Sequence, residues 1–384
     1  MRTYTRIWRH FDIWLLASVV LLTISGVAMI QSAIAGNETL ADNVSRQVIF
    51  AVVGLAVVII VAAIDYRMWA AIARPIFIIT LVLLAMIPIA GTVGFGSARW
   101  FTVGVVNIQP SELAKIFMIL VLADFLSRQQ PKRTPMRTLV QSVILVALPA
   151  LLVLIQPDLS TTIVLMVLWV ALVWAIGLPL QTIGILIVIA LVLFFAIAPF
   201  LANYFMVGFP EGEDFLFMKN YQMQRVATFL FPNPEESFGD TYNVEQARIS
   251  IGSGGLFGKG YGQGTQVQLR FLKVRHTDFI FSAMAEEFGF IGSVALIALL
   301  VLVIHRCLRA ARIARDRFGA LICYGVAILI FFQSAFNIGM NLNLFPVSGI
   351  PLPFFSYGGS SLLTSLLGIG LVESVILRHK QIEL

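Results

Sequence analysis

Apolar runs long enough to cross a bilayer recur along the whole chain, and they restrict its fold more than any other feature. Of the 384 residues, 59% are hydrophobic and 12% are charged, a composition that excludes an ordinary soluble domain. About 20 apolar helical residues cross the hydrocarbon core of a membrane, which is about 30 Å thick. Ten helices are expected, at 12–34, 46–64, 69–90, 112–127, 139–156, 158–177, 180–203, 278–305, 319–341 and 357–377.

These helices predict an all-α polytopic membrane protein that forms one domain over residues 1–384. Helices one to seven lie within 1–203, a long loop occupies 204–277, and helices eight to ten lie within 278–384. The first apolar run exceeds the core of a signal peptide and lacks a convincing small-residue cleavage site, so we expect it to be retained. No convincing internal repeat is visible, which weakens the interpretation of the chain as an inverted-repeat transporter.

Basic residues gather in the segments that ten spans would place on one side of the membrane. They are Arg2, Arg6, Arg9, Arg128, Lys132, Arg133, Arg137, Arg306, Arg309, Arg312, Arg315, Arg317, Arg378 and Lys380. Those between 306 and 317 are expected to fill the loop after the eighth helix. The positive-inside rule makes this side cytoplasmic, so both termini are expected inside and the loops 91–111, 204–277 and 341–356 outside. The net charge of +6 reflects this topology, because a nucleic-acid partner would require a basic face on a soluble fold.

Cysteine and histidine are too sparse to suggest a disulfide framework or a metal centre. Cys307 and Cys323 fall near the expected cytoplasmic ends of their helices, where a reducing compartment disfavours a disulfide. The histidines are scattered along the chain, so no histidine-based metal site is visible.

Ionisable residues concentrate at the start of the eighth helix, in "VRHTDFIFSAMAEEFG" (274–289). A charge inside the bilayer costs several kcal/mol, so such a cluster needs a physical reason. Thr277 or Asp278 is suited to cap the N-terminus of this helix. Alternatively, Asp278 is a carboxylate at the boundary of water and lipid, placed to take a proton from a substrate hydroxyl. The spacing alone leaves both interpretations open.

The start of the fourth helix, "QPSELAKI" (109–116), places Glu112 and Lys115 three residues apart on one face. These side chains can pair and neutralise each other within the bundle. They can also form the polar wall of a cavity, with Lys115 facing a phosphate group and Glu112 holding Lys115. Intramembrane ionisable residues favour this functional interpretation. Ser111 is a plausible N-cap of the same helix.

Three further stretches carry weaker signals. Asp158, in "IQPDLST", stands at another helix start, where capping explains it adequately and catalysis is the less favoured alternative. "GSGGLFGKGYGQG" (252–264) fails the phosphate-loop pattern, because Ser253 and Gly260 stand where Gly and Ser or Thr are needed. Its glycines instead allow a tight turn or a close approach to a ligand. The prolines and small residues of "FPVSGIPLPFFSYGGSSLL" (345–363) predict a bent or re-entrant loop that packs closely.

Within the long loop, "YQMQRVATFLF" (221–231) has amphipathic spacing. It is expected either to lie in the plane of the membrane interface or to form a short helix that caps the bundle. Together with the loops 91–111 and 341–356, it places polar and charged residues at the outer face.

Taken in order, these stretches resemble one family, the SEDS polytopic membrane proteins of bacterial wall synthesis. The stretches that carry the resemblance are "RQ" (46–47), "GSARWF" (96–101), "QPSELAKI" (109–116), "QPDLST" (156–161), "YQMQR" (221–225), "IGSGGLFGKG" (251–260), "GTQVQL" (264–269), "RHTDFIFSAMAEEFGFIG" (275–292) and "PLPFFSYGGSSLL" (351–363). They cover nearly the whole chain, and the family also shares the ten-helix count.

Side-chain choices make the chain similar to the elongation and shape branch of the family (RodA) rather than to its division branch (FtsW). The variants concerned are Arg275 before His276, "NIGM" (337–340) and "PVSGIPLPF" (346–354). The chain departs from the family at 273–274, where Lys-Val replaces the usual Pro-Glu. This change adds positive charge near Asp278.

The resemblance implies a peptidoglycan glycosyltransferase that polymerises lipid II at the outer face of the bacterial cytoplasmic membrane. On this interpretation Asp278 deprotonates the 4-hydroxyl of the acceptor sugar. The oxygen then attacks the anomeric carbon of the donor with inversion, and undecaprenyl pyrophosphate leaves. Cations help most where negative charge develops on the departing pyrophosphate. The residues that the resemblance implies for substrate binding are Lys115, Glu112, Arg46, Arg99 and Arg225, with Asp158, Arg275, His276 and Ser111 as accessory residues.

A divalent cation, Mg²⁺ or Mn²⁺, is able to share the stabilisation of pyrophosphate, although the sequence shows no dedicated ligand set. The resemblance also implies a partner, a class B penicillin-binding transpeptidase, within a complex of elongation proteins that determines rod shape. The chain has no large soluble domain and no outward Ser-x-x-Lys motif, so nothing in it would supply crosslinking.

Two other classes of function are compatible with parts of the sequence. The first is a transporter that flips lipid II, but alternating access requires a site near the midplane, and the charged residues gather at the outer face instead. The second is a scaffold that only recruits the transpeptidase, which leaves Asp278, Glu112 and Lys115 without a purpose.

Overall fold

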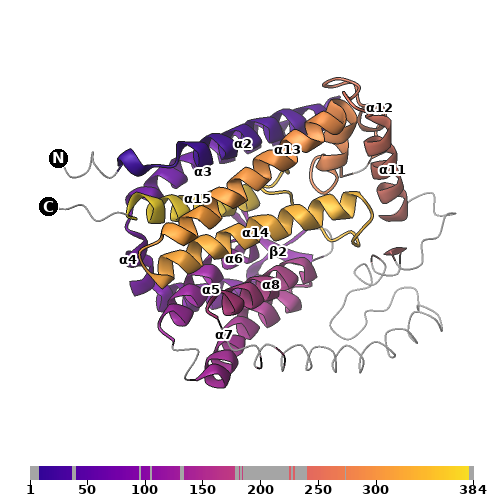
Figure 1. Cartoon of the computed structure of the whole chain (residues 1–384). Helices are drawn as coiled ribbons and strands as arrows, with labels where there is room; N and C mark the ends of the chain where they lie inside the picture. The colour runs from indigo at the N-terminus through magenta and orange to yellow at the C-terminus, as the bar shows by residue number, and fades with distance from the viewer. Residues whose placement is uncertain are drawn as a thin grey trace.

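The computed structural model describes most of the chain as a bundle of α-helices (Figure 1). The described residues are 8–36, 40–94, 97–103, 106–129, 134–177, 181, 184, 225, 228, 229, 240–272 and 274–379. The helix expected at 180–203 and the amphipathic segment 221–231 lie almost entirely outside these residues.

The helices follow one another with short connections through most of the described chain. They are α2 (Ile13–Ile34), α3 (Asp42–Ala63), α4 (Tyr66–Ala71), α5 (Ala73–Ala90), α6 (Pro110–Ser127), α7 (Pro135–Ile155), α8 (Leu159–Ala175), α11 (Asp240–Ser253), α12 (Thr265–Gln268), α13 (Ile280–Ile313), α14 (Arg317–Asn341) and α15 (Gly359–Leu377), preceded by the 3₁₀ turn η1 (Trp8–His10). Every expected helix other than that at 180–203 coincides with a described one.

Within the described residues, 7 helices are long and apolar enough to cross a membrane: α2, α3, α5, α7, α13, α14 and α15. α8 is a shorter apolar helix. α6 is buried along most of its length although it carries Glu112, Lys115 and Asp124. These observations support a polytopic, helical membrane protein.

The eighth expected helix is longer than predicted, because α13 continues to Ile313. The prediction that the arginines between 306 and 317 fill a loop is therefore wrong for most of them. Arg306, Arg309 and Arg312 lie on α13, and Arg317 opens α14. A spacing of three residues places the α13 arginines along one side of the helix. Their long side chains can keep the charges in water while the helix continues beyond the membrane.

A small sheet in the loop 91–111 was not predicted. Strands β1 (Thr92–Gly94), β2 (Ser97–Val103) and β3 (Val106–Ile108) pair antiparallel in the order β1-β2-β3. Phe101 lies opposite Ile108 in this ladder. Aromatic and β-branched residues favour strands, and the pairing satisfies backbone groups that a loose loop would expose. The sheet positions Arg99 and Trp100 close to the start of α6.

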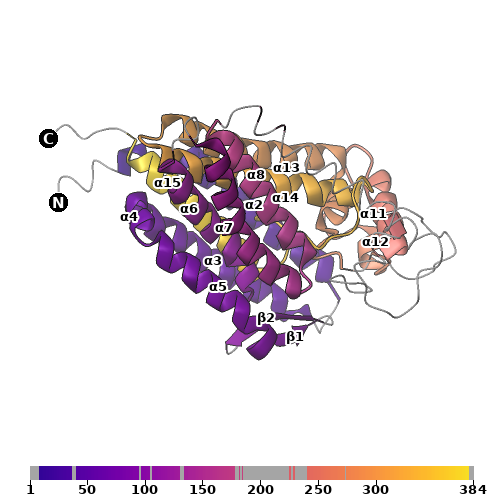
Figure 2. The same cartoon turned by 90° about the horizontal axis from the view of Figure 1, so that it is seen from below.

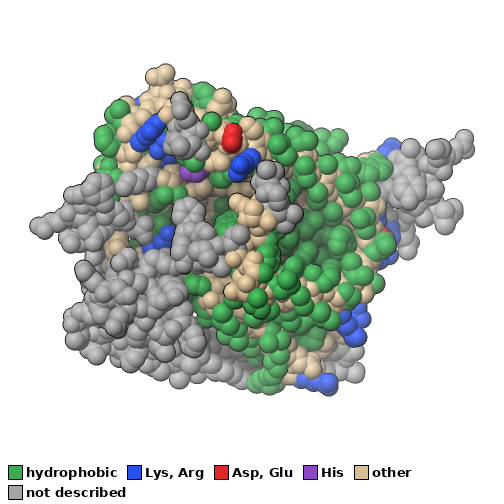
Figure 3. All heavy atoms as spheres, turned by 180° about the vertical axis from the view of Figure 1, so that it is seen from behind, with side chains coloured by type: hydrophobic (Ala, Val, Ile, Leu, Met, Phe, Trp, Pro, Cys, Tyr) green, Lys and Arg blue, Asp and Glu red, His purple; other side chains and the backbone are tan. Residues whose placement is uncertain are grey.

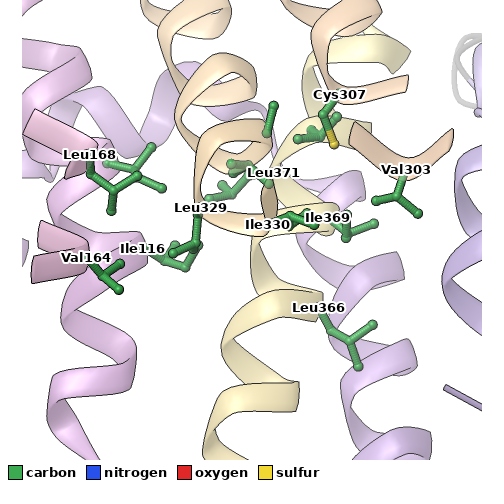
Figure 4. Close-up of a cluster of buried hydrophobic side chains, with 14 of the residues drawn as sticks. Ile116, Val164, Leu168, Val303, Cys307, Leu329, Ile330, Leu366, Ile369 and Leu371 are labelled. Atoms are coloured by element: carbon green, nitrogen blue, oxygen red, sulfur yellow. The ribbon is translucent and has the colours of Figure 1, made fainter. Parts of the chain in front are cut away.

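Small residues allow the helices to approach one another closely. A Cβ added to Gly370 of α15 would lie 2.9 Å from Val61 Cβ of α3, and one added to Gly359 would lie 2.3 Å from the Phe50 ring. The predicted close packing of the small residues before α15 is thus confirmed. In the central apolar cluster, Leu329 of α14 points toward Ile116 of α6 (Figure 4). Cys307 and Cys323 belong to this core and are free thiols, as expected.

The two ends of the bundle differ in chemistry. At one end the Asp12 N–H donates to Glu373 Oε2 (3.1 Å), which joins the start of α2 to the end of α15. We call this the basic end because it carries Arg9, Arg67, Arg74, Arg128, Arg137, Arg306, Arg309, Arg312, Arg315, Arg317 and Arg378. We call the opposite end, where α2 ends and α13 begins, the cavity end. The helices run between the two ends (Figures 1 and 2).

The surface between the two ends is apolar. Figure 3 shows a broad field of hydrophobic side chains, with Lys and Arg side chains along one edge. A belt of this kind suits the hydrocarbon core of a bilayer, with charges at the interface.

Gly26→Ala is expected to lower the unfolding temperature of the protein in detergent. Gly26 lies in α2, and a Cβ there would be 2.7 Å from Phe355 Cα in the loop before α15. Backbone atoms cannot move aside as a side-chain end can, so the crowding should cost about 1–3 kcal/mol. Gly252→Ala is the matched control, because Gly252 also lies in a helix and has nothing within 4 Å of its added Cβ. Equal unfolding temperatures for the two variants would contradict this close approach.

Candidate active site

A cavity of about 500 Å³ at the cavity end collects most of the predicted site residues. The starts of α6 and α8, strand β2, the turn before α13 and the loop before α15 all contribute to its wall. The predicted residues that line it are Arg99, Glu112, Lys115, Asp158, Arg225, His276 and Asp278. The fold therefore brings stretches that are far apart in the sequence around one space.

Asp278 is half-buried and lines the cavity from the turn that precedes α13. The capping interpretation is not supported, because α13 begins at Ile280 with Phe279 as its N-cap and no side chain caps it. A Cβ added to Gly349 would lie 3.8 Å from Asp278 Oδ2 and 3.9 Å from Arg225 Nη1. The carboxylate of Asp278 and the guanidinium of Arg225 therefore both lie close to Gly349 at the cavity.

Two buried asparagines of α14 hold the backbone of Asp278. Its carbonyl oxygen accepts hydrogen bonds from Asn337 Nδ2 (3.2 Å) and Asn341 Nδ2 (3.0 Å). Asn337 Nδ2 also donates to the Ile350 carbonyl (2.8 Å), and Asn341 Oδ1 accepts from the Ser282 hydroxyl (2.6 Å). These bonds fix the turn before α13 and the loop before α15 against α14. Neither residue was predicted as a site residue, although two amides four positions apart in an apolar helix were a visible signal.

Glu112 and Lys115 form a buried ion pair at the cavity wall. Lys115 Nζ lies 2.7 Å from Glu112 Oε1, and the two residues are 2% and 6% exposed. Glu112 Oε2 has no hydrogen-bond partner among the described residues. The two side chains neutralise each other and also line the cavity. The structural interpretation, an ion pair within the bundle, and the functional one, a polar cavity wall, are therefore compatible.

Asp158 caps α8, as the capping interpretation expected. Its carboxylate accepts from the Thr161 N–H (3.1 Å) and from the hydroxyls of Thr161 (2.9 Å) and Ser111 (3.1 Å). The prediction that Ser111 is the N-cap of its own helix is wrong, because Pro110 takes the first helical position and Gln109 becomes the N-cap. Ser111 instead ties α6 to α8 behind the cavity.

The predicted arginines differ in their relation to the cavity. Arg99 Nε donates to the Gln156 carbonyl (3.2 Å), and Arg99 Nη2 donates to the Pro157 carbonyl, which joins β2 to the turn before α8. Arg225 is half-buried at the cavity. Arg46 is exposed on α3 and Arg275 is buried, and neither is among the lining residues.

Arg275 fastens the turn that carries Asp278 to the end of α2. Its guanidinium donates to the Ala33 carbonyl and to the Leu272 carbonyl (3.3 Å). This contact positions the turn from the side opposite the cavity, so Arg275 supports the site without facing it.

His276 and Tyr357 close one side of the cavity. Their ring centroids are 5.7 Å apart, and the Tyr357 N–H donates to the His276 carbonyl (3.0 Å). Burial, together with the charge of Arg275, lowers the pKa of the His276 imidazole. Burial raises the pKa of the Tyr357 hydroxyl, which Arg46 lowers in part. At neutral pH both side chains are therefore uncharged.

A break in α13 at Gly289 (φ 67°, ψ −162°) shapes the support of the site. The glycine-rich loop fills the break, because the Lys259 N–H donates to the Glu286 carbonyl (3.0 Å) and the Gly260 N–H to the Glu287 carbonyl (2.9 Å). A Cβ at Gly258 would lie 2.1 Å from the Glu287 carbonyl oxygen. The glycines of this loop therefore serve close backbone contact, one of the two uses that their spacing suggested.

The two glutamates of the stretch 274–289 hold this same loop. Glu286 Oε1 accepts from Lys259 Nζ (2.6 Å), from the Thr265 hydroxyl (3.0 Å) and from the Gln266 N–H (3.1 Å). Glu287 Oε1 accepts from the Ser32 hydroxyl of α2 (2.5 Å). The first half of α13, which follows Asp278 directly, is thereby fixed to α2 and to the loop.

Two further polar side chains at the cavity were missed in the sequence. Gln333 Nε2 of α14 and Ser348 Oγ are buried, line the cavity and have no partner among the described residues. Gln333 is 1% exposed. Buried polar groups are normally hydrogen-bonded, so these atoms, with Glu112 Oε2, suit a polar ligand that would satisfy them.

The carboxylates at the cavity do not form a metal site made by protein ligands alone. In the described part of the chain no group of three or more His, Cys, Asp and Glu residues could hold a metal ion. Glu112 is engaged by Lys115 and Asp158 by its hydrogen bonds to α6 and α8. The donor set therefore does not fit a resident divalent cation.

His276→Gln is expected to reduce the fall in unfolding temperature that the protein shows as the pH drops below 6.5. Since the pKa of His276 lies below its usual 6.5 in the folded state, the unfolded chain binds this proton first. The stability contributed by neutral His276 is then complete above pH 6.5 and is lost as the pH falls through the folded pKa. Unfolding temperatures measured across this range, with His305→Gln as control, test it. If the unfolding temperature of His276→Gln falls with pH as steeply as that of the wild-type protein, the burial of this imidazole is contradicted.

Comparisons with known proteins agree with this architecture. The family FTSW_RODA_SPOVE, described as cell cycle protein, matches residues 8–381. The peptidoglycan glycosyltransferase MrdB of Escherichia coli is 35% identical over 97% of this chain and 95% of its own length. The probable peptidoglycan glycosyltransferase FtsW of Trichlorobacter lovleyi is 33% identical over 95% and 93%.

Solved structures show the same fold. A chain from a study of the structural coordination of polymerization and crosslinking by a peptidoglycan synthase complex is 29% identical, with a TM-score of 0.80 over 97% of this chain and 99% of that chain. The rod shape determining protein RodA of Thermus thermophilus is also 29% identical, with a TM-score of 0.69 over 97% and 98%. The chain belongs to the FtsW/RodA/SpoVE family, the SEDS proteins that its motifs resemble.

Proposed function

We propose that this protein is a peptidoglycan glycosyltransferase that polymerises lipid II during cell elongation and maintenance of rod shape. The observation that carries the proposal is the cavity that gathers Asp278, Lys115, Arg99 and Arg225. A carboxylate surrounded by cations suits transfer of a sugar from a pyrophosphate leaving group. Membership of a family whose relatives are named peptidoglycan glycosyltransferases supports the same reaction class.

Asp278 acts as the general base in this proposal. Its carboxylate takes the proton from the 4-hydroxyl of the acceptor sugar while the hydroxyl oxygen bonds to the anomeric carbon of the donor. The bond from that carbon to undecaprenyl pyrophosphate breaks, and the anomeric centre is inverted. The asparagine bonds to the Asp278 carbonyl hold the base in place before substrate binds, so little reorganisation accompanies the reaction.

Lys115, Arg99 and Arg225 stabilise the departing pyrophosphate. Lys115 is oriented by Glu112 at 2.7 Å, and the unpartnered amide of Gln333 offers an additional donor at the cavity. Because the wall is buried in the bundle, these charges act in a medium of lower polarity than water and therefore act more strongly. A divalent cation, Mg²⁺ or Mn²⁺, enters the proposal only as a companion of the substrate's phosphates, and no step depends on it.

We infer that the protein lies in the bacterial cytoplasmic membrane, with the basic end and both termini on the cytoplasmic side and the cavity on the outer side. The positive-inside rule supports this orientation, because the arginines of the basic end outnumber its acidic residues. The isoprenoid tail of the substrate then stays in the bilayer while its sugars reach the cavity.

The proposed partner is a class B penicillin-binding transpeptidase within the elongation complex. The likeness to a chain from a peptidoglycan synthase complex supports such an assembly. The likeness to MrdB and to RodA supports elongation, while division is the alternative that the FtsW relatives keep open.

Transport of lipid II is the other function weighed against this one. The cavity lies at one end of the bundle, where the strands and the turn before α13 meet, whereas alternating access uses a site near the midplane. Placement therefore favours the enzyme.

Asp278→Asn is expected to abolish glycan polymerisation. The purified protein, with its transpeptidase partner lacking the active-site serine, is given labelled lipid II in detergent, where flipping cannot mimic the product. The amide cannot accept the proton, so the rate should fall at least about 100-fold. Asp42→Asn changes an exposed residue at the start of α3 and is the control that should polymerise normally. Absence of polymer from the wild-type protein, or a native rate in Asp278→Asn, would falsify the proposal.

Lys115→Met is expected to lower turnover about 100- to 1,000-fold with a smaller effect on lipid II binding, because the lost cation acts on charge that develops at the leaving group. The single change also strands Glu112 as a buried charge, which costs about 3–5 kcal/mol. Lys115→Met/Glu112→Gln removes that charge, so it should recover stability but stay slow. A double variant that regains native turnover would reduce Lys115 to a structural residue.

A further inference from the structure

A second polar cavity, of about 730 Å³, lies at the basic end between α5, α6 and α7. Arg74 at the start of α5, Arg128 at the end of α6 and Arg137 at the start of α7 all line it. Gln129, Thr134 and Gln141 add further hydrogen-bonding groups. The cavity therefore presents cations and uncharged donors from three helix ends to one space.

The described residues do not neutralise the positive charge of this cavity. Arg128 pairs with Asp124, at 2.6 Å from Arg128 Nη2 to Asp124 Oδ1. Asp124 is the one acidic residue among its lining residues. Neither Arg74 nor Arg137 forms an ion pair with any described residue. Two exposed guanidinium groups thus face the cavity without an ion-pair partner in the described part of the chain.

The rest of the wall is apolar and continues onto the lipid-facing surface. Phe77, Phe125 and Leu145 are half-buried in it, and Ile78 is 61% exposed. Val140 and Ile144 on the neighbouring face of α7 are also exposed. A ligand in this place would meet cations at one end and a path for hydrocarbon at the other, as a phospholipid does.

This site is separate from the candidate active site. Glu112 and Asp124 both lie on α6, about 18 Å apart along the helix axis, and face different cavities. The substrate bound at the cavity end therefore leaves this space free.

We propose that the basic-end cavity binds the headgroup of an anionic phospholipid from the leaflet at that end of the bundle. The lipid phosphate lies between Arg74 and Arg137, the amides of Gln129 and Gln141 contact the headgroup, and an acyl chain follows Phe77 and Ile78. Basic pockets between transmembrane helices on the cytoplasmic side commonly hold such headgroups. A free phosphate ion offers the same anionic oxygens but would leave the apolar path empty.

A photo-crosslinking experiment tests the proposal on the full-length protein. Ile78→benzoylphenylalanine places a reactive group at the lipid-facing edge of the cavity, where its bulk is tolerated. The protein is irradiated in nanodiscs that contain equal amounts of phosphatidylglycerol and phosphatidylcholine with the same acyl chains. The attached lipid is identified by mass.

Adducts of phosphatidylglycerol should exceed those of phosphatidylcholine. Each arginine near an anionic surface contributes about a fivefold preference. Arg74→Gln/Arg137→Gln should therefore bring the adduct ratio close to that of the bulk membrane. Arg315→Gln, an exposed arginine at the same end that lines none of these cavities, should preserve the preference.

An equal adduct ratio in the otherwise native protein would overturn the proposal. So would an undiminished preference in Arg74→Gln/Arg137→Gln. Excess inorganic phosphate, compared with chloride at equal ionic strength, distinguishes the two sources of the anion. A preference that persists in phosphate supports the lipid, whereas its loss in phosphate alone shows that a free phosphate ion outcompetes the lipid and overturns the proposal.

Discussion

The break in α13 at Gly289 is the constraint on which the site depends. A helix interrupted inside a membrane protein exposes backbone groups that lipid cannot satisfy, so the glycine-rich loop must enter the gap and pair with the carbonyls of Glu286 and Glu287. Side chains larger than hydrogen at Gly254 or Gly258 would collide with this backbone. The short half-helix before the break is bonded to α2 through Glu287 and to α14 through Ser282, so it helps to hold the turn of Asp278 at the cavity.

The buried ionisable side chains near the cavity are also satisfied within the protein. Glu112 neutralises Lys115, Lys259 neutralises Glu286, and Asp158 is satisfied by hydroxyl and N–H donors. Two of these carboxylates keep an unused acceptor, because Glu112 Oε2 at the cavity wall and Glu286 Oε2 in α13 lack partners among the described residues. A polar substrate can therefore add its own bonds to a site that is already stable without it.

The helical membrane fold, the positions of the expected helices within the described residues and several residues that line the cavity could be predicted from the sequence, because hydropathy and local spacing can be read along the chain. Asp278, Glu112 and Lys115 were found in this way. The N-cap of α6 was missed because the helix starts two residues earlier than expected, at Pro110, with Gln109 as its N-cap. Arg46 and Arg275 match the family pattern, yet only the fold reveals that they do not line the cavity. Asn337, Asn341 and Gln333 were overlooked because the partners of a polar amide in an apolar helix belong to other parts of the chain. Those partners are known only once the neighbouring helices and loops are placed.

α13 also relates the active site to the membrane itself. It spans 34 residues, and 22% of its most apolar window is buried inside the protein, so this window is largely accessible to lipid. The part of α13 beyond the break at Gly289 continues to Ile313, about 36 Å of helix. This exceeds the hydrocarbon core, and a long helix answers a change in bilayer thickness by tilting or bending. Lipid therefore contacts part of the helix that follows Asp278. The thickness of the host membrane becomes one of the determinants of where the proposed base lies.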